Sequence, residues 1–533
     1  MGKYRLLVFL TVAAIFILST LLAGCGRKPM DKHLRYSVGA EPQTVDPRKS
    51  TGSPEATIEA QIFEGLTALD RYDHPIPAAA QRWDISPDEM KYTFFLRESA
   101  KWSNGDPVTA KDFVFAWRSA LDPNLASGYA YQLYYLKNGE AYNKGLATAE
   151  QIGVKAIDDH TLEVTLEKPT AYFLSLLAFH TYYPVHRSTA QSNEKWAAKV
   201  QTIIGNGPFK MTKWVHNSKI EFERNEYYWD AAKVKSNKLT FILTENSATE
   251  LALFENGLID MGNNPPISEI SRLIKEDHLQ IHPYLGTYFY CFNVTKPPFD
   301  DPKIRKAFSL VIDREAIIKN VVRGQQKAAL GWVPFGLPDA KADDDFRLVG
   351  GDLLKDKDVE TAKTLLSSAG YPDGQNLPPI TLLYNTSESH KAVAEAIQEM
   401  WRKNLGVNVS LVNQEWKVFL SSRHRGDYQV SRHGWLGDYA DPMTFLDMFT
   451  SDSGNNDAQY KNSDYDKLIT LAKKTSNPTL RLQALHTAEK MLLDDAVIAP
   501  IYFYTQLTMV TPHVKGYTHS VLGVTYFKEA YLE

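Results

Sequence analysis

The chain has 533 residues and a formal net charge of −4, with 44% hydrophobic and 23% charged residues. This length exceeds what one compact core accommodates, so two or three regions are expected, and the acidic balance argues against nucleic acid as a partner. Aromatic residues make up 12% of the chain. Such a content suits a ligand-binding surface as well as a large core.

The N-terminus has the pattern of an export signal. A short basic region precedes an almost wholly apolar run over residues 6–22, and Ala23-Gly24-Cys25 follows at once. The pattern predicts a lipoprotein-type signal peptide over residues 1–24, and its ending resembles a lipobox, in which the Cys is acylated. An uncleaved anchor is the alternative, although the apolar run is short for a membrane span. Acylated Cys25 and a flexible tether over residues 25–33 would hold the protein at an extracytoplasmic membrane surface.

The first half of the chain reads as strands and hairpins around one amphipathic helix. Residues 34–38 alternate like a strand, and Thr109 is a suitable N-cap for a helix that ends at Leu121. Hairpins are predicted over residues 154–166 and 210–224.

From residue 239 the pattern changes to alternating strands and helices. The most regular segment is a predicted helix over residues 388–405, which ends at Gly406. The other elements expected in chain order are a strand at 239–243, a helix at 248–256, two helices within 302–323, a helix at 359–369, strands at 380–384 and 407–412, a helix that begins at 413–416, two helices within 463–494, and a strand at 499–504. This alternation indicates an α/β fold.

One predicted strand-to-helix turn combines several features of a ligand site. Residues 427–431 alternate like a strand, and the turn lies at 432–442 before a short helical pattern. Gly434 permits a close backbone approach, and Trp435 offers flat apolar surface beside the carboxylate of Asp438, so the turn can hold a cation. A simpler interpretation is also open, in which Asp438 is one more solvated turn carboxylate.

Several motifs along the chain together resemble one protein family. Glu41-Pro-Gln-Thr-Val-Asp-Pro follows the first predicted strand, Trp102-Ser-Asn-Gly-Asp-Pro precedes the first helix, and the turn contains Trp-x-x-Asp-Tyr-x-x-Pro. These motifs resemble the oligopeptide-binding proteins of bacterial ABC peptide importers, in the peptide and nickel class of solute-binding proteins (family 5). Asn404-Leu-Gly-Val-Asn-Val, followed by Asn413-Gln-Glu-Trp-Lys, is specific to the oligopeptide branch. The resemblance covers nearly the whole mature chain.

The resemblance implies a fold like the type II periplasmic binding proteins, with two lobes joined by a hinge and an extra domain. Such a receptor closes on its ligand by a hinge motion. The implied regions are lobe 1 (domain I) at 34–63, 190–285 and 506–533, the extra domain (domain II) at 64–189, and lobe 2 (domain III) at 286–505. Enterobacterial relatives have a Cys pair at the positions of Gly286 and Leu436, so here packing must hold those segments together.

The resemblance also implies roles for individual residues. In that family the Asp of the turn motif binds the free α-amino group of the peptide, which assigns this role to Asp438. The residues that match basic positions for the peptide carboxylate are Arg432, Arg423, His390 and, after the paired helices, Arg323. The residues that match the ligand-facing motif or the cleft wall are Trp435, Gly434, Trp416, Tyr129, Asn264 and Tyr504.

These expectations describe a lipid-anchored, monomeric receptor that binds short peptides and delivers them to the membrane permease subunits of an ABC importer. A murein tripeptide, a signalling peptide, haem or a chelated metal is an alternative ligand, and a peptide hydrolase or chaperone is an alternative of another class. No enzyme motif, metal site or cofactor is expected. Cys291, in an apolar strand pattern, is predicted to be a buried structural thiol, against the alternative of a catalytic one.

Overall fold

The computed structural model describes residues 33–71, 73–170, 172–341, 344–475 and 477–533. The predicted signal peptide, Cys25 and all but the last residue of the predicted tether lie outside this part of the chain. Within it, no helix is both long enough and apolar enough to span a membrane.

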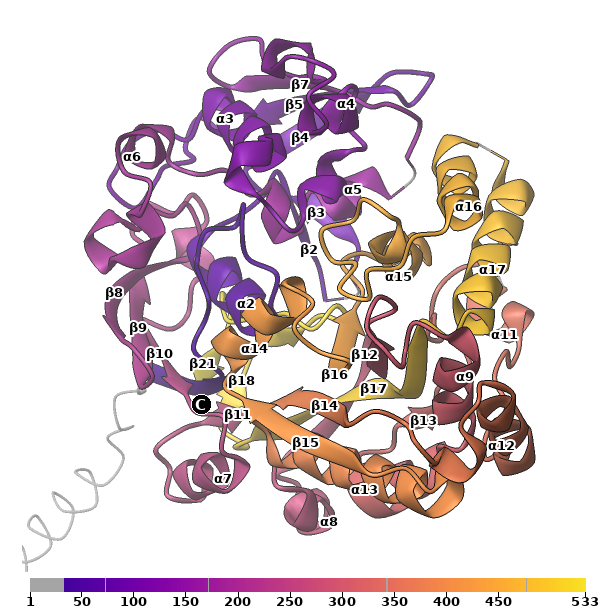
Figure 1. Cartoon of the computed structure of the whole chain (residues 1–533). Coiled ribbons are helices and arrows are strands. Elements are labelled where there is room, and N and C mark those ends of the chain that lie inside the picture. Colours follow the sequence, from indigo (N-terminus) through magenta and orange to yellow (C-terminus); the bar gives the residue numbers. More distant parts are fainter. Residues whose placement is uncertain (1–32, 72, 171, 342–343, 476) are drawn as a thin grey trace, which may run out of the picture.

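One large mixed sheet runs through the molecule (Figure 1). Its strand order is β15-β14-β16-β12-β17-β11-β1-β10-β9-β8, and β13 pairs with β17. The strands are β1 (His33–Gly39), β8 (Phe209–Val215), β9 (Lys219–Arg224), β10 (Lys238–Leu243), β11 (Met261–Gly262), β12 (Leu279–Phe292), β13 (Lys327–Ala328), β14 (Ile380–Asn385), β15 (Val409–Gln414), β16 (Val430–Leu436) and β17 (Ile498–Val510).

Two long antiparallel strands, β12 and β17, connect the two ends of this sheet. The first part of β12 pairs with the last part of β17, with Leu279 opposite Met509. The second part of β12 lies between β16 and β17. The register is irregular between Pro283 and Thr287, where proline has no N–H to donate to the ladder. The two strands stay paired on both sides of this segment, with a second register shift between Tyr288 and Phe289.

A separate antiparallel sheet lies within residues 64–189, at the top of Figure 1. Its order is β4-β5-β7-β6, formed by Ala80–Ile85, Lys91–Leu96, Thr161–Thr165 and Val154–Ala156. Helix α3 (Ala110–Leu121) begins with a capping box at Thr109, contacts β6 and buries Trp117 completely. Three two-stranded sheets are formed by β2 (Thr67–Leu69) with β3 (Pro75–Pro77), β18 (Val514–Lys515) with β21 (Tyr531–Leu532), and β19 (Thr518–His519) with β20 (Thr525–Tyr526).

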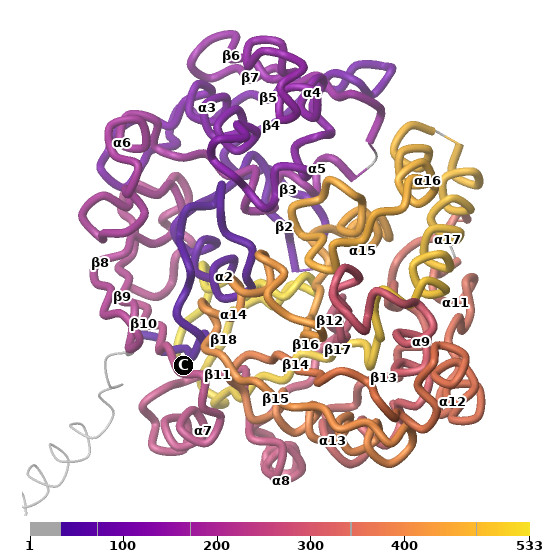
Figure 2. The backbone as a smooth tube through the Cα atoms, in the orientation of Figure 1, coloured from indigo at the N-terminus to yellow at the C-terminus, as the bar shows by residue number. Residues whose placement is uncertain are grey.

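Helices flank both ends of the large sheet. Besides α3, the α-helices of the described residues are α2 (Ser53–Ile62), α4 (Gly139–Asn143), α5 (Phe173–Leu176), α6 (Arg187–Ser192), α7 (Ser247–Glu255), α8 (Ile270–Lys275), α9 (Pro302–Leu310), α10 (Arg314–Ile317), α11 (Phe346–Gly350), α12 (Val359–Ser368), α13 (Glu388–Leu405), α14 (Trp416–His424), α15 (Met443–Leu446), α16 (Ser463–Lys474) and α17 (Pro478–Asp494). A buried cluster that includes Phe308, Ile397 and Trp401 packs α9 and α13 against the sheet. Figure 2 shows α2 and α14, from distant parts of the sequence, close together near the centre of the molecule.

The structure confirms the α/β prediction and most predicted elements. The helix expected at 388–405 is α13, and Gly406 ends it in the left-handed region at a φ of 70°. Both predicted hairpins form, as β6-β7 and β8-β9. Cys291 is buried, and its burial raises the pKa of the thiol to about 12, as befits a structural thiol.

Several predicted boundaries are wrong because long-range pairing sets them. The strand expected at 427–431 is β16, which pairs with β12 as far as Leu436 and therefore includes part of the predicted turn. The strand expected at 499–504 continues to Val510 because the first part of β12 pairs with its far end. The strand expected at 407–412 is shifted to β15. The segment 302–323 forms α9 and α10 as predicted, followed by a π-helical turn at Ile318–Val322.

Candidate functional site

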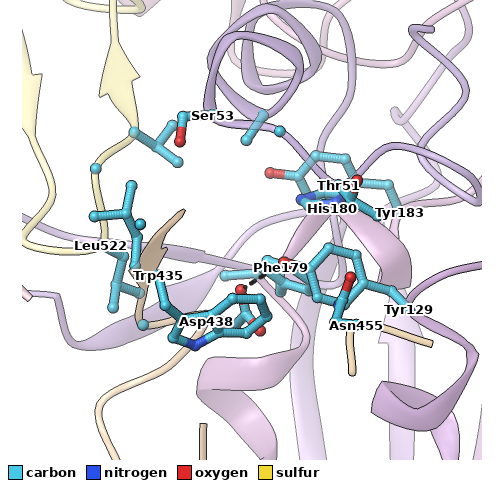
Figure 3. A pocket seen from close by; sticks show the side chains of 18 of the residues that line it. Thr51, Ser53, Tyr129, Phe179, His180, Tyr183, Trp435, Asp438, Asn455 and Leu522 are labelled. Atoms are coloured by element: carbon cyan, nitrogen blue, oxygen red, sulfur yellow. Dashed lines mark hydrogen bonds between the residues drawn. The ribbon is translucent and has the colours of Figure 1, made fainter. Parts of the chain in front are cut away.

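Two adjoining cavities lie between β16, α2 and α14. Cavity A, drawn in Figure 3, is lined by residues that include Thr51, Tyr129, Arg423, Trp435 and Asp438. Cavity B is lined by residues that include Glu245, Asn264, His390, Arg432 and Tyr504. Both share the lining residues Ser53, Trp416, Gly434, Leu436 and Gly523, so they are compartments of one cleft. The structure thus brings together in this cleft all the predicted ligand residues except Arg323.

Asp438 is a buried carboxylate without a cationic partner. Only 7% of its surface is exposed. It accepts hydrogen bonds from Tyr129 Oη at 3.2 Å and Gln132 Nε2 at 2.7 Å, and its N–H donates to Thr444 Oγ1 at 2.9 Å. No Lys, Arg or His in the described ranges forms an ion pair with Asp438, and burial together with the charge of Asp447 raises its pKa well above the usual range. A bound ammonium group would compensate this buried charge.

Aromatic side chains form the walls around this carboxylate. Figure 3 shows Trp435 beside Asp438, with Tyr129 and Phe179 nearby. The ring centroids of Tyr129 and Trp435 are 6.3 Å apart, and Trp435 Nε1 donates to the carbonyl of Thr444 at 2.8 Å. Trp416 adds a second indole that lines both cavities, and its buried Nε1 has no hydrogen-bond partner in the described part of the chain. These flat surfaces can pack against varied side chains.

Arg432 is the cationic counterpart in cavity B. Its guanidinium donates to Tyr504 Oη at 2.8 Å and to Asn385 Oδ1 at 3.3 Å, and it lies 4.8 Å from the centroid of the Tyr288 ring. Among the residues that the structure describes, no carboxylate pairs with it. Gly434 permits this arrangement, because a side chain there would overlap Tyr504 Oη.

His390 lies beside this cation. Its ring is 5.6 Å from the ring of Tyr288, and its buried Nδ1 has no hydrogen-bond partner within the described residues. Burial and the charge of Arg432 hold the pKa of His390 well below the usual range, so the imidazole is neutral at pH 7. A neutral imidazole can offer an anion a hydrogen bond but not a charge.

Arg423 lines cavity A but already has a carboxylate partner. Its Nη2 and Nε lie 2.8 and 3.0 Å from Asp457 Oδ2, and His424 Nδ1 lies 3.1 Å from Asp457 Oδ1. Although burial opposes the effect, the charge of Arg423 lowers the pKa of Asp457 far below its ordinary value. A ligand carboxylate at Arg423 would therefore compete with Asp457.

Of the two remaining basic and polar predictions, Asn264 lies in the cleft and Arg323 lies on the surface. Asn264 lines cavity B and donates from Nδ2 to the carbonyl of Glu245 at 3.2 Å. Arg323 is exposed, ends the π-helical turn at a φ of 54° and lines neither cavity. The nearby Val322 and Gln326 line cavity B instead. The structure therefore does not place Arg323 with the other candidate residues.

Sequence reasoning missed several polar residues in or beside the cleft, among them Gln132 and Glu245. Gln132 contacts Asp438, and no local pattern marks it, since it lies in a short 3₁₀ turn (Ala130–Leu133). Glu245 lines cavity B between β10 and α7, where a polar residue at the end of a predicted strand was the available signal.

Comparisons with known proteins agree with this arrangement. Residues 74–457 match the family described as "Bacterial extracellular solute-binding proteins, family 5 Middle". The oligopeptide-binding protein OppA of Bacillus subtilis is 40% identical over 510 residues, which cover 94% of this chain and 92% of OppA. The crystal structure of Haemophilus influenzae OppA in complex with RPPGFSPFR has a TM-score of 0.88 at 36% identity and covers 94% of this chain and 99% of its own.

Two structures of one further relative differ in their similarity to this chain. The Escherichia coli murein tripeptide-binding protein MppA has a TM-score of 0.88, with 94% of this chain and 98% of that chain covered at 36% identity. MppA in an unliganded open form has a TM-score of 0.62, with 94% and 97% covered at the same 36% identity. Since identity and coverage hardly change, the difference lies in how the parts of the molecule are arranged. The whole-chain matches establish that this protein belongs to the bacterial extracellular solute-binding proteins of family 5.

Proposed function

We propose that this protein is an extracytoplasmic receptor that binds short peptides in the cleft and delivers them to an ABC importer. The main support is that one cleft contains a buried carboxyl group, Asp438 in cavity A, and a buried guanidinium, Arg432 in cavity B, neither of which has a partner of opposite charge among the described residues. A zwitterionic peptide has one ammonium and one carboxylate group separated by an extended chain, so it complements both. The named relatives that bind oligopeptides support the same function.

In this proposal Asp438 binds the α-ammonium group and sets where every peptide begins. Arg432, with His390 beside it, binds the carboxylate of peptides that reach cavity B, and Arg423 serves a different length by releasing Asp457. The peptide backbone would pair with the free edge of β16, because β14 pairs with β16 only at Val430 and Ser431. Main-chain hydrogen bonds of this kind provide affinity without selecting a sequence.

The proposed binding motion is closure of two lobes with the boundaries predicted from the sequence. The boundary at 285/286 falls within the irregular segment of β12, and the boundary at 505/506 lies beside it in β17, where Thr505 is opposite Pro283, so a bend there would disturb few ladder bonds. Contacts across the cleft include Tyr135 Oη to Tyr439 Oη at 3.0 Å and the stacked rings of Tyr172 and Tyr439, with centroids 4.8 Å apart. The lower similarity to the open form of MppA supports a closed arrangement in this structure.

The sequence also suggests that the receptor lies at the membrane and contacts the permease subunits of the importer. Acylated Cys25 would anchor the receptor to the membrane beside the permease subunits that accept the peptide. We propose binding without catalysis, since the family consists of solute-binding proteins.

Native mass spectrometry of the purified protein tests this function. We expect a heterogeneous set of bound masses that denaturation releases as short peptides, and fewer of them on Asp438→Asn. Release of one murein tripeptide, haem or a metal complex would establish a narrower ligand. Cleavage of added peptides would contradict the receptor function and favour a hydrolase.

A further inference from the structure

Cavity B contains a carboxylate that the proposed binding of peptide termini does not use. Glu245 follows β10, precedes α7 and lines cavity B together with Asn264 and Trp416. Its side chain is half-buried, and Oε1 accepts a hydrogen bond from the backbone N–H of Trp416 at 3.4 Å. No Lys, Arg or His of the described ranges forms an ion pair with Glu245. Within the described residues its charge is therefore stabilised by hydrogen bonds from the Trp416 N–H and the Thr386 side chain, and by no cation.

The surroundings of Glu245 favour a cation. Burial, partly offset by the Trp416 N–H, and the nearby charge of Glu415 raise the pKa of Glu245. Glu415 itself lines neither cavity, and its oxygens accept the N–H groups of Lys417 and Val418 at the start of α14. Arg432 and His390 line the same cavity, but the hydrogen bonds of Arg432 go to neutral groups and His390 is uncharged.

A single carboxylate of this kind suits an organic cation better than a metal ion. The described residues contain no group of three or more His, Cys, Asp or Glu side chains that could hold a metal. Lysine and arginine side chains are long enough to extend from a peptide backbone to a cavity wall, and each donates hydrogen bonds to a carboxylate. The cleft is continuous from cavity A into cavity B, so a peptide that begins at Asp438 presents its later residues to Glu245.

We infer that Glu245 is a specificity-determining residue, which binds the Lys or Arg side chain of a peptide residue beyond the first. This inference rests on the proposed function and adds a preference to it. A peptide with an apolar side chain at the same position still binds through its termini and backbone, but it leaves Glu245 without a partner. The receptor therefore accepts many peptides and favours those that are basic at one internal or C-terminal position.

Calorimetry with tetrapeptides tests this preference. Each peptide has a free amine and consists of alanine, with lysine or norleucine placed at one position at a time. Norleucine supplies a linear aliphatic chain without the ammonium group. For the wild-type protein we expect lysine to bind about tenfold more tightly than norleucine at one position beyond the first, the effect of one hydrogen bond to a charged group. Glu245→Gln should remove this difference and bind the norleucine peptide as the wild type does.

Glu388→Gln is the matched control. Glu388 accepts a hydrogen bond from Ser247 Oγ at 2.8 Å, so it joins the same two parts of the chain, but it lines neither cavity. This variant should keep the wild-type ratio of lysine to norleucine affinities. Equal losses for both peptides on Glu245→Gln would overturn the inference, since Glu245 would then only hold the cleft closed. Equal affinities in the wild type would overturn it as well, whereas binding of none of these peptides would contradict the proposed function itself.

Discussion

Asp438 and Arg432 belong to one short segment around the end of β16, yet they line different cavities of the cleft. Each is buried, and within the described residues neither has a partner of opposite charge. Leaving two such charges uncompensated costs free energy of folding, which a ligand of complementary charge recovers on binding. The arrangement therefore favours zwitterionic ligands of suitable length.

Replacing Asp438 with Asn is expected to weaken binding of peptides that have a free amine. Removal of one partner of a buried ion pair typically costs about 3–5 kcal/mol, because the other charge stays desolvated. Acetylation of the peptide N-terminus should weaken binding to the wild type strongly and to the Asn variant much less. Calorimetry with matched free and acetylated peptides measures both effects. Wild-type affinity of Asp438→Asn for free-amine peptides would contradict the assignment.

Arg432 and Arg423 are expected to respond differently to replacement by Gln. Arg423→Gln leaves Asp457 buried without its main partner, so we expect a loss of about 3–5 kcal/mol in the free energy of unfolding. Arg432→Gln removes a charge that has no carboxylate partner, so its loss of stability should be smaller. Instead it should change the relative affinities for tri-, tetra- and pentapeptides without abolishing binding. Calorimetric unfolding and peptide titrations compare the variants, and equal stability losses would refute this distinction.

Ligand binding is expected to make the protein more compact. If the lobes are separated in the free protein and a peptide bridges them, small-angle X-ray scattering should show a smaller radius of gyration at saturating peptide. The profile with ligand should approach the one calculated from the present structure. A ligand-independent profile would count against closure as the binding motion.

Cys25→Ala is expected to release the protein from the membrane. Without the acylated cysteine, the mature chain has only protein contacts with the permease to retain it. Fractionation followed by alkaline washing measures this release. Retention of the variant in washed membranes would show that acylation at Cys25 is not the anchor.

Glu250 is expected to make folding stability depend on pH. It is fully buried, accepts hydrogen bonds from Ser37 Oγ at 2.5 Å and the Asn264 N–H at 2.8 Å, and its burial raises its pKa from 4.5 to about 7. Between these values the folded chain keeps a proton that the unfolded chain releases, so stability falls as pH rises through about 7.

Glu250→Gln provides the comparison, since its side chain stays neutral at every pH. The wild type should lose about 3 kcal/mol relative to this variant between pH 4 and pH 8. Denaturant unfolding at several pH values measures the difference. A difference between the two proteins that stays constant across this range would mean that Glu250 is not protonated in the folded state.

The helix at 388–405 could be predicted to the residue, because its signals are local. Ser387 accepts the N–H of His390 as the N-cap, and Gly406 supplies the left-handed end. The bounds of β16 could not be predicted in this way. They depend on pairing with β12, a strand far away in the sequence, whose register extends to Gly286 opposite Leu436. This direct pairing also joins the two positions where enterobacterial relatives are expected to have a Cys pair.

The candidate site could likewise be predicted only in part, because contacts between residues far apart in the sequence determine the rest. The role proposed for Asp438 comes from resemblance to a family, whereas its buried environment depends on Tyr129 and Gln132, which are 309 and 306 positions away. From the sequence, Arg423 and Arg432 are both predicted to bind the peptide carboxylate. The structure shows that Asp457 forms an ion pair with Arg423 and not with Arg432. Glu245 has no motif around it, so its position in cavity B had to come from the structure.

The two long strands that cross the molecule limit what opening the cleft can disturb. Because β12 and β17 remain paired on each side of the irregular segment at Pro283, a rotation there leaves both parts of the sheet intact. In the proposed opening, the surfaces that separate would include the aromatic side chains of Tyr135, Tyr172 and Tyr439, whereas the apolar cluster around Trp401 lies within lobe 2. Each cycle of capture and release would therefore change the hydration of an aromatic seam that includes Tyr129, Trp435 and Tyr439, while the cluster around Trp401 keeps its packing.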